Sequence, residues 1–126
     1  MNFQTPLARA RGLGSAREGS HHWWRQRVTA IALFPLAFWL ALAVADLPNA
    51  SYQDVMAWVM VPWNSLLLIS FIIIGFFHAM LGLQVVIEDY IHTDWVKILS
   101  ILGVNIVLAF LGLAAALATL RIVFSG

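Results

Sequence analysis

Three long stretches of apolar side chains dominate the sequence, and they decide which solvent the folded chain must face. The stretches cover about residues 28–47, 62–87 and 96–122. At about 1.5 Å per residue, a helix of each length crosses the hydrocarbon core of a bilayer. Of the 126 residues, 62% are hydrophobic and 10% are charged, and a soluble domain of this size cannot bury so much apolar surface. The sequence therefore predicts an all-α membrane protein with three transmembrane helices.

Polar segments separate the three spans. Residues 1–20 are polar and lack an apolar face, so we expect a flexible tail ahead of a membrane domain at residues 21–126. A transit peptide is also rich in arginine, but this tail is short and runs directly into the first span.

The connector at residues 48–60 is expected to hold a short interfacial helix. Pro35 should bend the first span, Pro62 suits the first turn of the second, and the small residues of the third should allow close helix packing.

Basic residues are concentrated ahead of the first span. Five arginines precede that span: Arg9, Arg11, Arg17, Arg25 and Arg27. The connector at residues 48–60 has no Lys or Arg, whereas the turn at residues 88–97 has Lys97. Because Lys and Arg collect on the cytoplasmic side of a membrane, we expect the N-terminus and the 88–97 turn to be cytoplasmic.

His78 lies near the middle of the second span, about 15 Å along the helix from Glu88 at its acidic end. An ionisable side chain at this depth is costly and marks a candidate functional site. At about 100° per residue, Gly75, Gly82 and Asp89 share the helix face of His78, so there is room beside the imidazole for a flat ligand or another helix. The alternative is a neutral histidine that hydrogen-bonds across helices and only packs the bundle.

The number of available ligands limits what His78 can bind. The chain has no cysteine, which excludes thiol chemistry and ligation of an iron–sulfur cluster by Cys. A zinc site needs three or four ligands, but one histidine suffices for one axial position on a haem, with the second supplied by another chain. A transporter or proton pathway would need acids inside the spans. The acidic residues lie in the tail, at span ends or in connectors, which disfavours that class.

Further candidate residues lie at the predicted cytoplasmic end. A Tyr90 hydroxyl oriented by Asp89 could donate a hydrogen bond to the carbonyl oxygen of a ligand, although a residue of the aromatic belt and a helix end explain the pair equally well. Arg27 could pair with a carboxylate of a cofactor or anchor the helix to lipid phosphates. His21 and His22 are expected to be solvated at the interface.

The second span resembles the small hydrophobic anchor subunit, usually called D, of succinate dehydrogenases. The pattern reads His78, three residues, Gly82, and then Asp89 and Tyr90 eleven and twelve residues after the histidine. Arg27-Val-Thr-Ala-Ile, six residues after His21, is similar to the family's entry into its first helix.

The resemblance implies half of a cytochrome b anchor bundle, in which subunits C and D hold one haem b with one axial histidine from each chain. It implies that His78 is the haem ligand and that Tyr90 hydrogen-bonds ubiquinone. Asp89 would orient Tyr90 or handle protons. Arg27, with His21, would lie near the haem propionates or the mouth of the quinone site.

The function implied is that of a membrane anchor that helps pass electrons from an iron–sulfur subunit to ubiquinone, in the respiratory chain and the tricarboxylic acid cycle. The chain would catalyse nothing alone. Its partners would be a flavoprotein, an iron–sulfur subunit, a second anchor of the cytochrome b556 type and lipid, with no nucleic acid. The bacterial inner membrane is expected, rather than the mitochondrial one. Two alternatives are a haem-less or other cytochrome b anchor of a different quinone-linked dehydrogenase, and a structural protein with a packing histidine.

Overall fold

The computed structural model of the chain describes residues 5–7 and 16–125. Its long elements are the helices α2 (Ala16–Val44), α4 (Pro62–Tyr90) and α5 (Asp94–Ser125). The shorter η1 (Leu47–Asn49) and α3 (Tyr52–Met60) connect α2 to α4. The described residues form no strand, and the three long helices are each apolar and long enough to cross a membrane. The prediction of an all-α chain with three transmembrane helices is confirmed.

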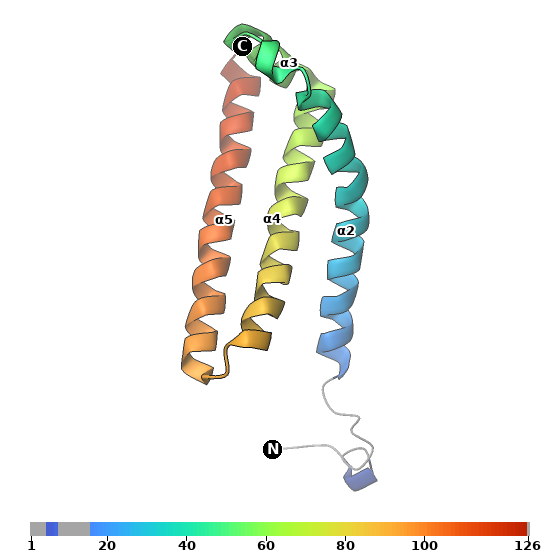
Figure 1. Cartoon of the computed structure of the whole chain (residues 1–126), viewed down its shortest axis with the longest axis vertical. Helices are drawn as coiled ribbons and strands as arrows, with labels where there is room; N and C mark the ends of the chain where they lie inside the picture. The colour runs from blue at the N-terminus through green and yellow to red at the C-terminus, as the bar shows by residue number, and fades with distance from the viewer. Residues whose placement is uncertain (1–4, 8–15, 126) are drawn as a thin grey trace.

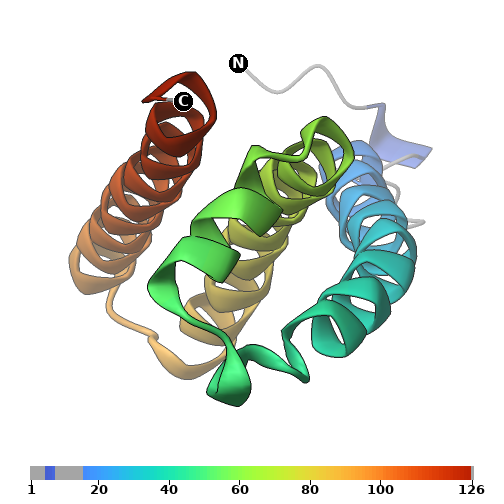
Figure 2. The ribbon, with the colours of Figure 1, turned by 90° about the horizontal axis from the view of Figure 1, so that it is seen from above.

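The three long helices stand in a row with α4 in the middle. α4 packs along α2 on one side and along α5 on the other (Figures 1 and 2). α3 crosses one end of the row, where the C-terminus also lies, whereas the start of α2 and the turn between α4 and α5 share the opposite end (Figure 1). The two ends of the row therefore differ, and at one of them the first turns of α2 lie at the same level as the last turn of α4.

Most of the surface of the long helices is apolar and exposed. The described residues include only two buried hydrophobic side chains, Val59 and Leu81. Phe34 on α2 and Phe110 on α5 are 79% and 72% exposed. Exposure of so large an apolar surface to water is unfavourable for a monomer, so lipid or other apolar helices must cover it.

The ends of α2 differ from the span expected at residues 28–47. The helix begins at Ala16, inside the segment expected to be a tail, and ends at Val44. The expected flexibility of that tail falls mainly on residues 1–4 and 8–15, outside the described part of the chain, as do Arg9 and Arg11. α2 continues through Pro35, and it curves along its length in Figure 1, in keeping with the bend expected there.

The expected interfacial helix is α3, and its start is encoded locally. The backbone N–H of Asp54 donates to the Ser51 hydroxyl at 3.1 Å, and the Asp54 carboxylate accepts from the Ser51 N–H at 2.9 Å. This reciprocal capping box satisfies two backbone donors at the helix start. Hydrogen bonds from the Ser51 side chain and backbone lower the pKa of Asp54. Trp58 of α3 stacks on Trp39 of α2 with ring centroids 5.7 Å apart, so α3 also closes that end of the row.

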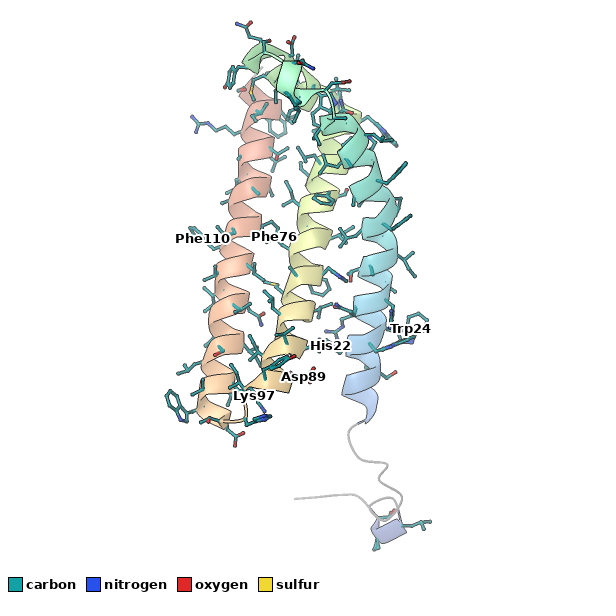
Figure 3. All side chains as sticks on the ribbon, viewed as in Figure 1. His22, Trp24, Phe76, Asp89, Lys97 and Phe110 are labelled. Carbon is teal, nitrogen blue, oxygen red and sulfur yellow. The ribbon has the colours of Figure 1, made fainter. Side chains whose placement is uncertain are left out.

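α4 and α5 are in close contact at Gly112, as the small residues of the third span predict. A Cβ built on Gly112 would lie 3.0 Å from Cγ and 3.2 Å from Cβ of Phe76. Figure 3 shows Phe76 on the side of α4 that faces α5. The Cβ of Phe76 is fixed to its backbone, so it cannot swing away from a new methyl group.

We therefore expect Gly112→Ala to destabilise the contact between α4 and α5. Overpacking costs about 1–3 kcal/mol, which outweighs the gain of about 1 kcal/mol when alanine replaces glycine in a helix. The midpoint of unfolding of the detergent-solubilised protein by sodium dodecyl sulfate should fall. Gly103→Ala is the matched control, because it makes the same change on the same helix where nothing lies within 4 Å. Equal midpoints for the two variants would contradict this account of the packing.

Candidate functional site

His78 lies on α4 and turns toward α2. Its Nδ1 atom is 2.8 Å from the hydroxyl oxygen of Thr29 on α2, and this hydrogen bond joins the two helices. Within the described part of the chain, no other hydrogen bond involves the imidazole, so its Nε2 atom has no partner. Nor is Nε2 among the enclosed polar atoms that lack a partner. Nε2 is therefore unpaired and not fully enclosed by the described residues.

One face of α2 provides the surroundings of the histidine. His22, Gln26, Thr29 and Leu33 follow one another at spacings of four, three and four residues, which places them on one side of a helix. A Cβ built on Gly82 would lie 3.5 Å from the amide nitrogen of Gln26, and one on Gly75 would lie 3.8 Å from Cδ2 of Leu33. The helix face with the two glycines beside His78 thus packs against α2, which is the second of the two possibilities that the sequence left open.

Two polar atoms on this α2 face are enclosed without a hydrogen-bond partner. They are Nε2 of His22 and Oε1 of Gln26. Figure 3 places His22 between α2 and α4, close to the end where Asp89 lies. Leaving a polar atom enclosed and unpaired costs about 1–3 kcal/mol, so these atoms are the least satisfied part of the interface. The expectation that His22 is solvated is wrong for its Nε2 atom, which is enclosed, although the residue as a whole is partly exposed.

Tyr90 and Asp89 occupy the last turn of α4. Tyr90 is 80% exposed, and the helical rise of about 1.5 Å per residue puts its backbone about 18 Å from that of His78 along the axis. Within the described residues no hydrogen bond joins the side chains of Asp89 and Tyr90, so the isolated chain does not use Asp89 to orient the tyrosine. Figure 3 shows Asp89 at the same end of the row as His22 of α2 and Lys97 of α5.

Arg27 and His21 lie on other faces of α2 and are exposed. The guanidinium carbon of Arg27 lies 5.4 Å from the ring centroid of Trp23, a cation–π contact, and Trp23 packs edge-on against Trp24. The structure therefore does not bring Arg27 or His21 together with His78. The arrangement of a cation over an exposed indole suits the boundary between lipid and water.

An apolar hollow of about 280 Å³ lies between α4 and α5, and His78 is not among the residues that line it. Its lining consists of Phe71, Ile72, Gly75, Phe76, Ala79 and Leu108. The described residues contain no group of three or more His, Cys, Asp or Glu side chains that could hold a metal ion. The unpaired ring nitrogen of His78 could bind a metal-containing group that takes only one ligand from this chain.

Sequence reasoning missed Thr29 and Gln26, which the structure places next to His78 and Gly82. The repeated spacing of polar residues from His22 to Thr29 was a usable signal, because it defines one polar stripe on an otherwise apolar helix. The spacing alone could not reveal which helix this stripe would meet.

Known proteins that match this chain belong to one family of membrane subunits. The family described as "Succinate dehydrogenase/Fumarate reductase transmembrane subunit" matches residues 1–112. The succinate dehydrogenase hydrophobic membrane anchor subunit of Rickettsia conorii is 41% identical over 91 residues, covering 71% of this chain and 72% of that protein. The subunits of the same name from Rickettsia bellii and Paracoccus denitrificans are both 36% identical. They cover 83% and 71% of this chain and 84% and 70% of their own lengths. No solved structure matches the chain.

Proposed function

Since this chain belongs to the family of succinate dehydrogenase membrane anchor subunits, we propose that it binds one face of a haem b through His78 and forms part of a ubiquinone site at Tyr90. Membership of the family implies a complex with other subunits. In this proposal those are a flavoprotein, an iron–sulfur subunit and a second anchor that supplies the other axial ligand. The bacterial relatives support a place in a bacterial inner membrane. The arginines ahead of the first span support a cytoplasmic location for the start of α2.

The main support for the proposal is the hydrogen bonding of the two ring nitrogens of His78. One ring nitrogen is held by Thr29 and the other is unpaired and not fully enclosed, near the middle of a membrane-spanning helix. A histidine that ligates a metal has this arrangement, with one nitrogen toward the metal and the other toward an oxygen atom. When bound, haem would supply a one-electron redox centre whose potential depends on its axial ligands and buried surroundings.

Tyr90 would act on the quinone. Reduction of a quinone adds two electrons and two protons, and negative charge develops on its carbonyl oxygens before they are protonated. A hydroxyl that donates to one of these oxygens stabilises that charge. Tyr90 is exposed at the end of α4, so its hydroxyl is available to a ligand held between this chain and its partners. Succinate would be oxidised on the flavoprotein, and this chain alone would catalyse no step.

One observation favours a second candidate. The hydrogen bond between Thr29 and His78 is also what a histidine that only packs two helices would make. In that case the chain would anchor the complex without taking part in cofactor binding. The two candidate functions differ in whether Nε2 of His78 binds a haem, and the visible haem spectrum of the assembled complex distinguishes them.

The anchor function is tested by deleting the chain while its partner subunits are still produced. We expect succinate oxidation with a soluble artificial acceptor to persist but to move from the membrane fraction to the soluble fraction. Electron transfer from succinate to ubiquinone should be lost and should return when the chain is restored. Full quinone-linked activity in membranes that lack this chain would contradict the proposal.

A further inference from the structure

We propose that Thr29 is a positioning residue for haem ligation, because its hydroxyl accepts a hydrogen bond from Nδ1 of His78 and so leaves the lone pair on Nε2 for the iron. The inference deepens the proposed haem site and rests on it. Thr29 would not touch the haem. It would set which nitrogen of His78 carries the proton and in which direction the ring points.

The hydrogen-bond geometry around Thr29 decides the direction of the bond. The Thr29 hydroxyl oxygen lies 2.7 Å from the backbone carbonyl oxygen of Arg25 and 3.1 Å from that of Gln26. Carbonyl oxygens only accept, and a hydroxyl has a single proton to donate. Two oxygens 2.7 Å apart without a proton between them would repel each other, so the hydroxyl proton points at the carbonyl of Arg25. Toward His78, 2.8 Å away, Thr29 can then act only as an acceptor.

The tautomer of the imidazole follows from this direction. A neutral imidazole carries one proton, and an acceptor beside Nδ1 places that proton on Nδ1. Nε2 then carries a lone pair, which is the form that binds a metal. Within the described part of the chain Nε2 has no hydrogen-bond partner that would compete for this lone pair.

The packing of α2 on α4 holds Thr29 in place. Gly75 and Gly82 flank His78 along α4, and a Cβ built on either would lie at van der Waals distance from Leu33 or Gln26 of α2. The face of α4 that carries His78 therefore packs directly on α2, and the Thr29 hydroxyl lies 2.8 Å from Nδ1. The β-branched side chain of Thr29 is further restrained by its bond to the preceding helical turn.

The test uses the complete purified complex with Thr29→Val, which keeps the shape of the side chain and removes the hydroxyl, and Thr29→Ser, which keeps the hydroxyl. Thr119→Val is the matched control. Thr119 is a buried threonine of α5 whose hydroxyl donates to the carbonyl of Ala115 at 3.0 Å, and within the described residues no hydrogen bond joins it to a histidine. The readouts are the electron paramagnetic resonance spectrum of the oxidised haem, its midpoint potential and the rate of haem loss.

We expect Thr29→Val to shift the g-values and to raise the midpoint potential, because loss of the acceptor makes the imidazole a weaker electron donor to the iron. Haem should be retained about 10-fold to 100-fold less tightly, the usual effect of removing such a partner. Thr29→Ser and Thr119→Val should resemble the unsubstituted complex. If Val at this position blocks assembly, Thr29→Ala removes the same hydroxyl with less bulk, and the comparison with Thr29→Ser still holds.

Two results would overturn the inference, and they are distinguishable. Haem in the unsubstituted complex, with unchanged g-values, potential and retention in Thr29→Val or Thr29→Ala, would remove the role of Thr29 and leave the haem site standing. Absence of haem from a fully assembled unsubstituted complex would overturn the haem proposal and the role of Thr29 together.

Discussion

Replacing His78 with alanine is expected to abolish the b-type signal in the visible difference spectrum, reduced with dithionite minus oxidised, of the purified complex. Among the histidines of the described residues, His78 alone lies near the middle of a membrane-spanning helix, and an axial position left empty weakens haem retention and changes its spin state. The effect should therefore be nearly complete, rather than a partial shift. The substitution also removes the hydrogen bond to Thr29, which contributes about 0.5–1.5 kcal/mol to packing.

The spectral change must be separated from a failure to assemble. Subunit stoichiometry of the purified complex reports assembly directly, and the haem content is compared per assembled complex. His92→Ala is the matched control, because His92 lies exposed in the turn between α4 and α5. It should leave the spectrum unchanged. A normal b-type spectrum in assembled His78→Ala complex would exclude ligation by His78, and the imidazole would then serve only to pack α2 against α4.

Replacing Tyr90 with phenylalanine should lower electron transfer from succinate to ubiquinone about 10-fold to 100-fold. A hydrogen bond to a group that carries charge contributes about 1.5–3 kcal/mol, and about 1.4 kcal/mol corresponds to a tenfold change in rate. The substitution removes only the hydroxyl, and at 80% exposure the ring carries little packing within this chain. Steady-state assays with ubiquinone and with a soluble artificial acceptor should therefore diverge, since only the first uses the quinone site.

The chain provides its own control for this experiment. Its other tyrosine, Tyr52, begins α3 at the opposite end of the row and is 76% exposed. Tyr52→Phe makes the same chemical change in a similar setting, far from the proposed quinone site, and should leave both activities unchanged. Equal losses in the two variants, or no loss in Tyr90→Phe, would remove Tyr90 from the proposed site.

The sequence predicted the three long helices because their signal is local. The apolar stretches and Pro62 at the start of α4 are each recognised from the local sequence. The start of α2 was harder to predict, because the helix begins at Ala16, among polar residues that show no apolar pattern. Helix ends of this kind depend on backbone hydrogen bonding rather than on hydropathy.

The site was predicted less completely than the fold. His78 was found because a histidine among apolar residues is unusual at any position in a span. Thr29 and Gln26 were not found, because their importance depends on the register between α2 and α4, and helix periodicity does not determine that register. His22 and His21 differ by one position, about 100° around the helix, and only the orientation of α2 decides which of them is enclosed.

The row of three helices has a consequence for the cell. With α4 between α2 and α5, residues 16–125 form no closed interior, and two of their enclosed polar atoms remain unpaired. Its stability therefore depends on the concentration of whatever covers its flanks, by mass action. A copy made in excess of its partners stays exposed to membrane proteases, so the abundance of this subunit should follow the rate at which its partners are synthesised.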